Sequence, residues 1–179
     1  MPDAGEVRVA GRSTREIATD TEWLVSLDRF GIVTARAVLI GALPIAANLA
    51  LPMTLSIEPM ADEIRDRVER LADEVGLPGA RLDAAASTLS AEERVRVHLA
   101  RALAADPLVL LLEHPTAGVE VAAAEAIGET LRRVSDARGL GWIALTEDDR
   151  FVRATGATRL RLRPATGELV REGFWKRMF

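Results

Sequence analysis

Phosphate binding by a protein loop needs backbone N–H groups, a cation and a hydroxyl at a fixed spacing, and one segment carries part of this set. Gly5 and Gly11 are followed by Arg12, Ser13 and Thr14. A phosphate-binding loop has four residues between its glycines and a lysine before the hydroxyl. Here five residues separate the glycines, and arginine replaces lysine. The segment is therefore predicted to form a strand and a turn, and the 179 residues contain no such loop.

A helix start at Ser90 is a second place where phosphate could bind. Ser90 and Glu93 have the spacing of a capping box, in which each side chain accepts from the other residue's backbone N–H. The hydroxyl and the positive end of a helix both attract phosphate. The carboxylate of Glu92 would repel it. Ser90 can thus be a phosphate ligand or simply a helix cap.

The two histidines of the chain differ in the catalytic or metal-binding roles that the sequence allows them. His114 follows Glu113 and the apolar run 108–112. Its neutral imidazole could act as a base, since the ordinary pKa of histidine is near 6.5. His98 lies within the helix that begins at Ser90 and has no second histidine four residues away, which argues against a metal site.

The composition is that of one globular domain, with 49% hydrophobic and 28% charged residues. The net charge is −4, which gives no basic surface for nucleic acid. Cysteine is absent, so neither a disulfide nor a thiolate metal site can form. The first nine residues have no apolar signal core, and a cytoplasmic protein is expected.

The apolar pattern alternates between helices and strands, which predicts an α/β fold with a layered sheet. A uniformly apolar strand such as 108–112 is expected in the centre of a parallel sheet, covered on both faces, and 142–145 is expected to be a second buried strand. Strands are predicted at 6–9 and 31–34, helices at 44–51, 60–75, 90–105 and a segment ending near 139, and a hairpin at 158–171.

Residues 37–57 contain no charged side chain and are long enough to cross a bilayer. Pro44 and Pro52 interrupt any single helix, because each lacks a backbone donor. Two interpretations follow: a membrane span, or a buried loop and short helix that docks a partner protein. The prolines favour the second interpretation.

The central third of the chain resembles the ATP-binding cassette (ABC) family. Residues 89–103 are similar to its signature helix, written LSGGQ followed by xxRVxLARAL, and residues 106–120 to its Walker B and D-loop segment. Residues 2–11, 31–35 and 145–148 resemble flanking family segments, and 43–52 resemble lipoprotein- and macrolide-exporting cassettes. The resemblance implies a truncated P-loop NTPase-like sheet, an N-terminally incomplete domain over 1–179 with a helical subdomain at about 59–105.

The resemblance also implies roles for individual positions. Glu113 stands at the Walker B aspartate, which holds the Mg²⁺ water shell, and His114 stands at the catalytic glutamate. Ala35 stands at the Q-loop glutamine, and Glu147 at the switch histidine. Each of these four residues differs from the family's usual one, and Ala35 can contact neither Mg²⁺ nor water.

The signature positions that bind the ATP of an opposite protomer fall on Ser90, Ala91 and Glu92, where alanine and glutamate replace both glycines. ATP and Mg²⁺ are therefore implied by resemblance only. The expected function is that of a degenerate nucleotide-binding subunit, unable to bind or hydrolyse ATP alone. Its implied partners are a membrane permease, which holds it at the inner membrane, and a second cassette. An active ATPase whose Walker A region is not in this chain and a non-catalytic adaptor are the alternatives.

Overall fold

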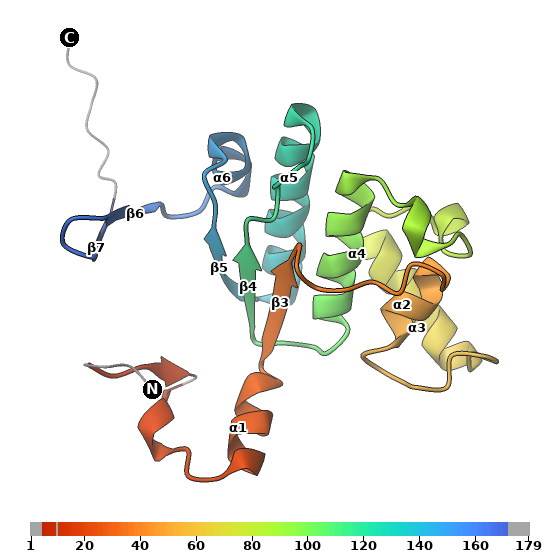
Figure 1. The fold of residues 1–179 in the computed structure, drawn as a ribbon, viewed down its shortest axis with the longest axis horizontal. Helices are drawn as coiled ribbons and strands as arrows, with labels where there is room; N and C mark the ends of the chain where they lie inside the picture. Colours follow the sequence, from red (N-terminus) through yellow and green to blue (C-terminus); the bar gives the residue numbers. More distant parts are fainter. Residues whose placement is uncertain (1–4, 10, 172–179) are drawn as a thin grey trace.

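The computed structural model describes residues 5–9 and 11–171, which form a three-stranded parallel sheet with helices on one face (Figure 1). The strand order is β3 (Phe30–Thr34), β4 (Val109–Glu113) and β5 (Gly141–Leu145). The predicted α/β layered fold is confirmed. Of the opening segment, residues 2–4 and 10 lie outside the described residues.

Two antiparallel strand pairs lie outside this sheet. One pairs β1 (Arg8–Val9) with β2 (Arg12–Ser13), and the other pairs β6 (Leu160–Arg163) with β7 (Glu168–Arg171), which confirms the predicted hairpin. The helices are α1 (Asp20–Leu27), α2 (Ile45–Ala50), α3 (Asp62–Glu74), α4 (Ala91–Leu103), α5 (Val121–Arg138) and α6 (Asp149–Thr155), with 3-10 turns η1 (Thr14–Glu16), η2 (Gly79–Arg81) and η3 (Ala86–Thr88).

Local sequence explains where the main helices begin and end. The predicted capping box is present at α4, where the Ser90 hydroxyl accepts from the Glu93 N–H and the Glu93 carboxylate accepts from the Ser90 N–H. Helix α5 ends at Gly139, which has a left-handed φ of 64°. Glycine adopts this conformation without the steric cost that a Cβ atom brings. Helix α3 ends before Gly76, whose φ of +71° has the same role.

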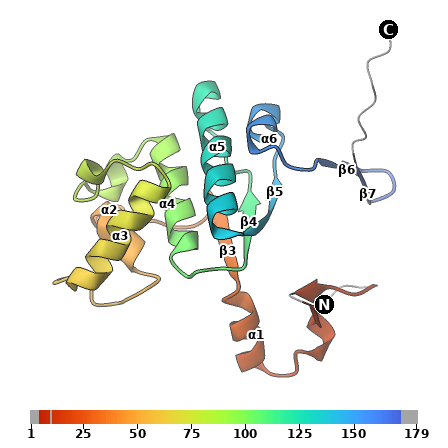
Figure 2. The ribbon, with the colours of Figure 1, turned by 180° about the vertical axis from the view of Figure 1, so that it is seen from behind.

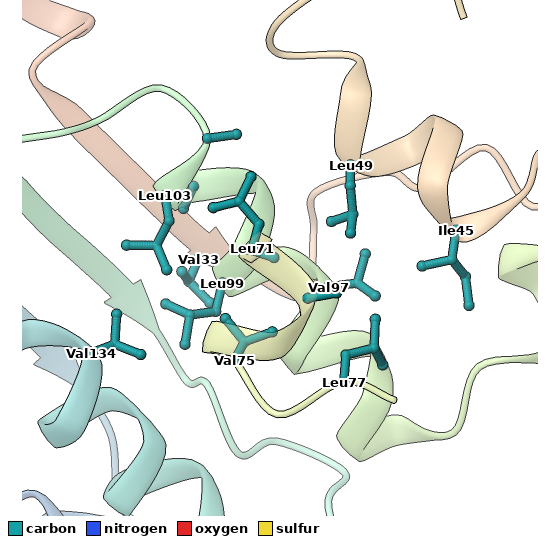
Figure 3. Close-up of a cluster of buried hydrophobic side chains, with 14 of the residues drawn as sticks. Val33, Ile45, Leu49, Leu71, Val75, Leu77, Val97, Leu99, Leu103 and Val134 are labelled. Carbon is teal, nitrogen blue, oxygen red and sulfur yellow. The ribbon is translucent and has the colours of Figure 1, made fainter. Parts of the chain in front are cut away.

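The core lies between the covered face of the sheet and helices α2 to α5 (Figures 1 and 3). Val33 of β3 faces the buried leucines of α4, and the apolar stripe of α3 packs against them. The predicted stripe is confirmed for Val68, Leu71 and Val75, all with at most 3% exposure. Sheet and helices therefore share one continuous apolar core.

The opposite face of the sheet is open, which corrects two predictions. Helix α5 covers one face of the sheet, the face that is turned toward the reader in Figure 2. The register places Ile32, Leu111 and Ile143 side by side on the open face, and Ile32 and Ile143 are 58% and 62% exposed. The strand at 108–112 is thus covered on one face, and β5 is not a buried strand. The physical reason is that β5 is the sheet edge and no described element packs over this face.

Within residues 37–57, helix α2 belongs to the core and is not part of a binding surface, whereas the loops on either side of it are exposed or half-buried. All six residues of α2 are buried, and Leu49 has no exposure. The Asn48 side chain accepts from the Ile40 N–H and so fixes the preceding loop. Only Val38, Ile40 and Leu55 of this stretch remain exposed large apolar side chains. None of the helices in residues 5–9 and 11–171 has the length and apolar character needed to span a membrane.

Helices α5 and α6 approach each other closely at Gly128. A Cβ atom there would lie 2.8 Å from the Ala154 Cβ atom and 2.8 Å from the Phe151 carbonyl oxygen. We expect Gly128→Val to lower the free energy of unfolding by about 1–3 kcal/mol, the usual cost of overpacking. Urea unfolding of the purified variant measures this change. An unchanged midpoint would show that α6 moves away without cost.

Candidate functional site

Four of the sequence-predicted site residues lie at the carboxyl ends of the parallel strands. Ala35 follows β3, Glu113 ends β4 and is followed by His114, and Glu147 comes two residues after β5. The register pairs Thr34 with Glu113 and Glu113 with Leu145, so all three strands end at one edge (Figure 1). We call Ala35, Glu113, His114 and Glu147 the strand-end cluster.

Glu113 already has two partners within the chain. Its Oε2 atom accepts a hydrogen bond of 2.8 Å from the Thr34 hydroxyl. Its Oε1 atom lies 3.5 Å from Nη2 of Arg36. Because the Glu113 side chain is 38% exposed and that of Arg36 is 85% exposed, this ion pair is a surface pair and adds little stability. The pair places a positive charge beside the carboxylate that the family resemblance assigns to the metal position.

His114 is positioned by its backbone. Its N–H donates to the Leu145 carbonyl oxygen at 2.8 Å, and its own carbonyl accepts from the Ala117 N–H. Its φ is 45°, which is unusual for a residue with a side chain. The imidazole is exposed and has no hydrogen-bond partner within residues 5–9 and 11–171. A histidine base is normally oriented by a second group, and none of the described residues does so.

The segment after β5 is organised by Asp148 and not by Glu147. The Asp148 carboxylate accepts from the N–H groups of Arg150 and Phe151 and so caps α6. Burial raises the pKa of Asp148, but these bonds and one from the Thr116 hydroxyl outweigh it, so that the pKa lies below its usual value. Glu147 is exposed. Sequence reasoning missed the roles of Asp148 and Thr116, although an aspartate directly before a helix is a capping signal.

The start of α4 forms a separate group. The Ser90 hydroxyl accepts from the Glu93 N–H at 3.2 Å, and Arg81 pairs with Glu93 at 2.7 Å. The pKa of Glu93 is therefore lowered, first by Arg81 and then by the Ser90 N–H. Ala91 is exposed. The Ser90 hydroxyl thus acts as a helix cap in this structure.

Glu92 is tied to the body of α4. Its Oε1 atom accepts from Nη2 of Arg96 at 2.7 Å, one helical turn further along. Arg96 also donates to the Val75 carbonyl oxygen and to Thr130. The pair partly neutralises the charge that the sequence predicts to repel phosphate. In the described part of the chain, no hydrogen bond or ion pair joins Ser90, Ala91 or Glu92 to the strand-end cluster.

His98 packs inside the domain with 5% exposure. Burial, followed by the charges of Arg101 and Arg94, lowers its pKa to about 4. It is therefore neutral at physiological pH. No cluster of three histidine, cysteine or acidic side chains able to hold a metal occurs within residues 5–9 and 11–171.

Comparison with known proteins decides the family. The sequence profile described as "ABC transporter" matches residues 1–117, well over half of the chain. The chain belongs to the ABC transporter family. A methionine import ATP-binding protein, MetN 2 of Paraburkholderia xenovorans (strain LB400), is 34% identical over 153 residues, which cover 85% of this chain and 39% of that protein.

Other relatives agree with this assignment. The methionine import ATP-binding protein MetN of Haemophilus influenzae (strain 86-028NP) is 31% identical over 152 residues, covering 85% of this chain and 43% of its own length. This ABC family chain thus spans about two fifths of these relatives. The ATP-binding cassette MJ0796, solved as a dimer after hydrolysis with ADP and Pi, superimposes with a TM-score of 0.69 at 26% identity, covering 86% of this chain and 67% of that one.

The residues of this ABC family chain do not by themselves fit a site for MgATP. Magnesium is usually held by one or two carboxylates, water and substrate phosphates. A metal beside Glu113 would also meet the positive charge of Arg36, an exposed side chain 3.5 Å from the carboxylate. Ala35 offers no oxygen side chain, and the 179 residues contain no phosphate-binding loop with its lysine. The fold of the family is thus present, whereas the donor set for its usual ligand is incomplete.

Proposed function

We propose that this chain is a degenerate nucleotide-binding subunit of an ABC transporter, which neither binds nor hydrolyses ATP on its own. The observation that carries the proposal is the pairing of Glu113 with Arg36 and Thr34. The carboxylate at the metal position is satisfied inside the chain, and a guanidinium lies where a divalent cation would approach. In a cassette that does not bind magnesium, this carboxylate is free to form bonds within the chain.

The other residues of the strand-end cluster support the same proposal. A base for water attack must be held within hydrogen-bond reach of the water, and the exposed His114 imidazole has no orienting partner within residues 5–9 and 11–171. Glu147 places an exposed carboxylate where a transferring phosphate needs hydrogen-bond donors. Two acids and an unoriented imidazole do not stabilise a phosphoryl-transfer transition state.

The subunit acts, in this proposal, through its cassette surfaces. Its partners are a membrane permease, which holds it at the cytoplasmic face of the inner membrane, and a second cassette, as MJ0796 forms a dimer. Val38 and Ile40 before α2 and Leu55 after it are exposed apolar side chains that the permease contacts in this proposal. We assign residues 59–105 to the helical subdomain. The resemblance to lipoprotein- and macrolide-exporting cassettes remains a prediction. The relatives of this chain named above are methionine import ATP-binding proteins.

A phosphate-release assay with purified chain and MgATP tests the catalytic half of the proposal. We expect no release above the protein-free control, because neither metal nor water is positioned. The triple variant Glu113→Asp, His114→Glu, Glu147→His, which restores family-like residues at three positions, should remain inactive alone, since these changes supply no phosphate contacts. Release from the unaltered chain that His114→Ala abolishes would contradict the proposal.

A further inference from the structure

A small cavity lies beside α4, where this helix packs against β3 (Figure 1). We call it the α4 cavity. His98, Arg101 and Ala102, which share one face of α4, form one wall, and Gly31 and Pro52 belong to the others. The volume of about 270 Å³ is below the range of roughly 300–1,000 Å³ that small-molecule pockets have. The cavity therefore suits a single side chain better than a whole small-molecule ligand.

Arg101 is half-buried and has no acidic partner. The other half-buried arginines of residues 5–9 and 11–171 each form an ion pair with a carboxylate; they are Arg67, Arg81, Arg96, Arg138 and Arg159. Arg101 forms none within these residues, and its Nη1 atom donates one hydrogen bond of 2.8 Å to the Val38 carbonyl oxygen. Burial lowers the pKa of Arg101, whereas the hydrogen bond with Glu74 raises that of Arg138. Since a buried charge is unfavourable without a counter-ion, an anion that enters the cavity would be stabilised there.

His98 is the second polar group of the cavity wall. It is 5% exposed and makes no hydrogen bond with any residue that the structure describes. Among these residues, no side-chain nitrogen or oxygen is both fully buried and without a partner, so the ring nitrogens of His98 open onto the cavity. Because the imidazole is neutral at physiological pH, it provides one N–H donor.

The charges around the cavity favour a carboxylate. The lining residues contributed by β3 and by the segments on either side of α2 are uncharged, among them Phe30, Ile32 and Ala37. The charged groups that act on His98 are Arg94 and Arg101, both cationic. One guanidinium lining the cavity balances the single charge of a carboxylate and binds it with two parallel hydrogen bonds. A phosphate group carries a charge of about −1.5 to −2 and would be only partly balanced.

The surface beside the cavity is apolar. Val38, whose carbonyl oxygen is held by Arg101, is 78% exposed, and Ile40 is 46% exposed. An acidic side chain that enters the cavity brings its neighbouring residues onto this surface. Those neighbours should therefore be apolar, which describes a segment of a protein and not a free ion.

We propose that the α4 cavity binds an acidic side chain of a partner protein, whose carboxylate pairs with Arg101 and accepts a hydrogen bond from His98. The inference rests on the proposed function only for a partner that contacts Val38 and Ile40. It adds the chemical group by which that partner is recognised. Whether this chain binds ATP does not enter the argument.

The test uses the 179-residue chain and the peptide acetyl-Ala-Leu-Glu-Leu-Ala-amide as the probe. The chain has two histidines, so proton NMR follows the ring signals of His98 and His114 separately. We expect saturating peptide to shift the His98 signal and to raise the pKa of His98 by at least about 1, because an opposite charge arrives beside it. The signal of His114 should not move. The same peptide with glutamine in place of glutamate should bind at least about tenfold more weakly.

Arg101→Gln should weaken binding of the glutamate peptide at least about tenfold, and Arg94→Gln, on the exposed side of the same helix, is the matched control. If Arg101→Gln loses cooperative unfolding, Ala105→Glu replaces it. Ala105 is exposed and lines the cavity, so the new carboxylate competes with the peptide for Arg101. Ala122→Glu on the exposed surface of α5 is then the control.

Three results would overturn the proposal: no shift of the His98 signal, equal affinity for the glutamate and glutamine peptides, or equal affinity for butyrate and the glutamate peptide. The last would assign the cavity to a free acid. Saturable MgATP binding with unchanged peptide selectivity would instead contradict the proposed function and leave this inference standing.

Discussion

Leu49→Ser should lower the free energy of unfolding by about 3–5 kcal/mol, one of the two largest effects expected in this chain. Leu49 lies in α2 with no exposure and packs in the core shown in Figure 3. The change removes buried methyl groups, leaves a cavity and places a hydroxyl in apolar surroundings. Urea unfolding followed by far-ultraviolet circular dichroism measures the loss.

Leu55→Ser is the matched control, because Leu55 belongs to the same uncharged stretch and is 90% exposed. Its unfolding free energy should stay within about 0.5 kcal/mol of the unaltered chain. Equal effects of the two substitutions would contradict the division of residues 37–57 into a core helix and an exposed loop. In a complex with a permease, only Leu55→Ser should weaken association of a folded domain.

Arg96→Ala should lower the free energy of unfolding by about 2–3 kcal/mol, since its guanidinium makes charge-assisted bonds that nothing replaces. Its side chain is 13% exposed and joins three elements. It contacts Glu92 in α4, the Val75 carbonyl oxygen after α3 and Thr130 in α5. The substitution leaves the Val75 carbonyl without its donor and Glu92 without its counter-ion.

Arg94→Ala provides the control, because Arg94 is an exposed residue of the same helix. We expect a change within about 0.5 kcal/mol there. A double-mutant cycle with Glu92→Gln and Arg96→Ala should give a coupling energy of about 0.5–3 kcal/mol. A coupling near zero would show that Glu92 is free to face a ligand in solution.

Helices and strands with strong periodic patterns could be predicted from sequence. The stripe of α3, the capping box of α4 and the apolar strand β4 each follow from local side-chain chemistry. Helix α1 was missed although Thr19 and Glu22 form a capping box like that of Ser90 and Glu93. No residue of α1 is buried, so the helix lacks the apolar stripe packed against a core on which such predictions rely.

The positions of the candidate site could be predicted, but not their partners. The family resemblance pointed to Ala35, Glu113 and Glu147, and the parallel register of the strands brings these positions to one edge of the sheet. The bond from Thr34 to Glu113 joins residues 79 positions apart, and no local pattern encodes it. The exposure of Ile143 likewise depends on which elements cover the sheet, since an apolar run alone reads as buried.

Isothermal titration calorimetry of MgATP into the 179-residue chain tests the central claim most directly. The account predicts no saturable heat, because Glu113 is paired with Arg36 and the chain offers no phosphate-binding loop. Arg36→Ala should not create binding, since it frees one carboxylate but adds no phosphate contact. A dissociation constant tighter than about 100 μM, equivalent to about −5.5 kcal/mol, would contradict the account.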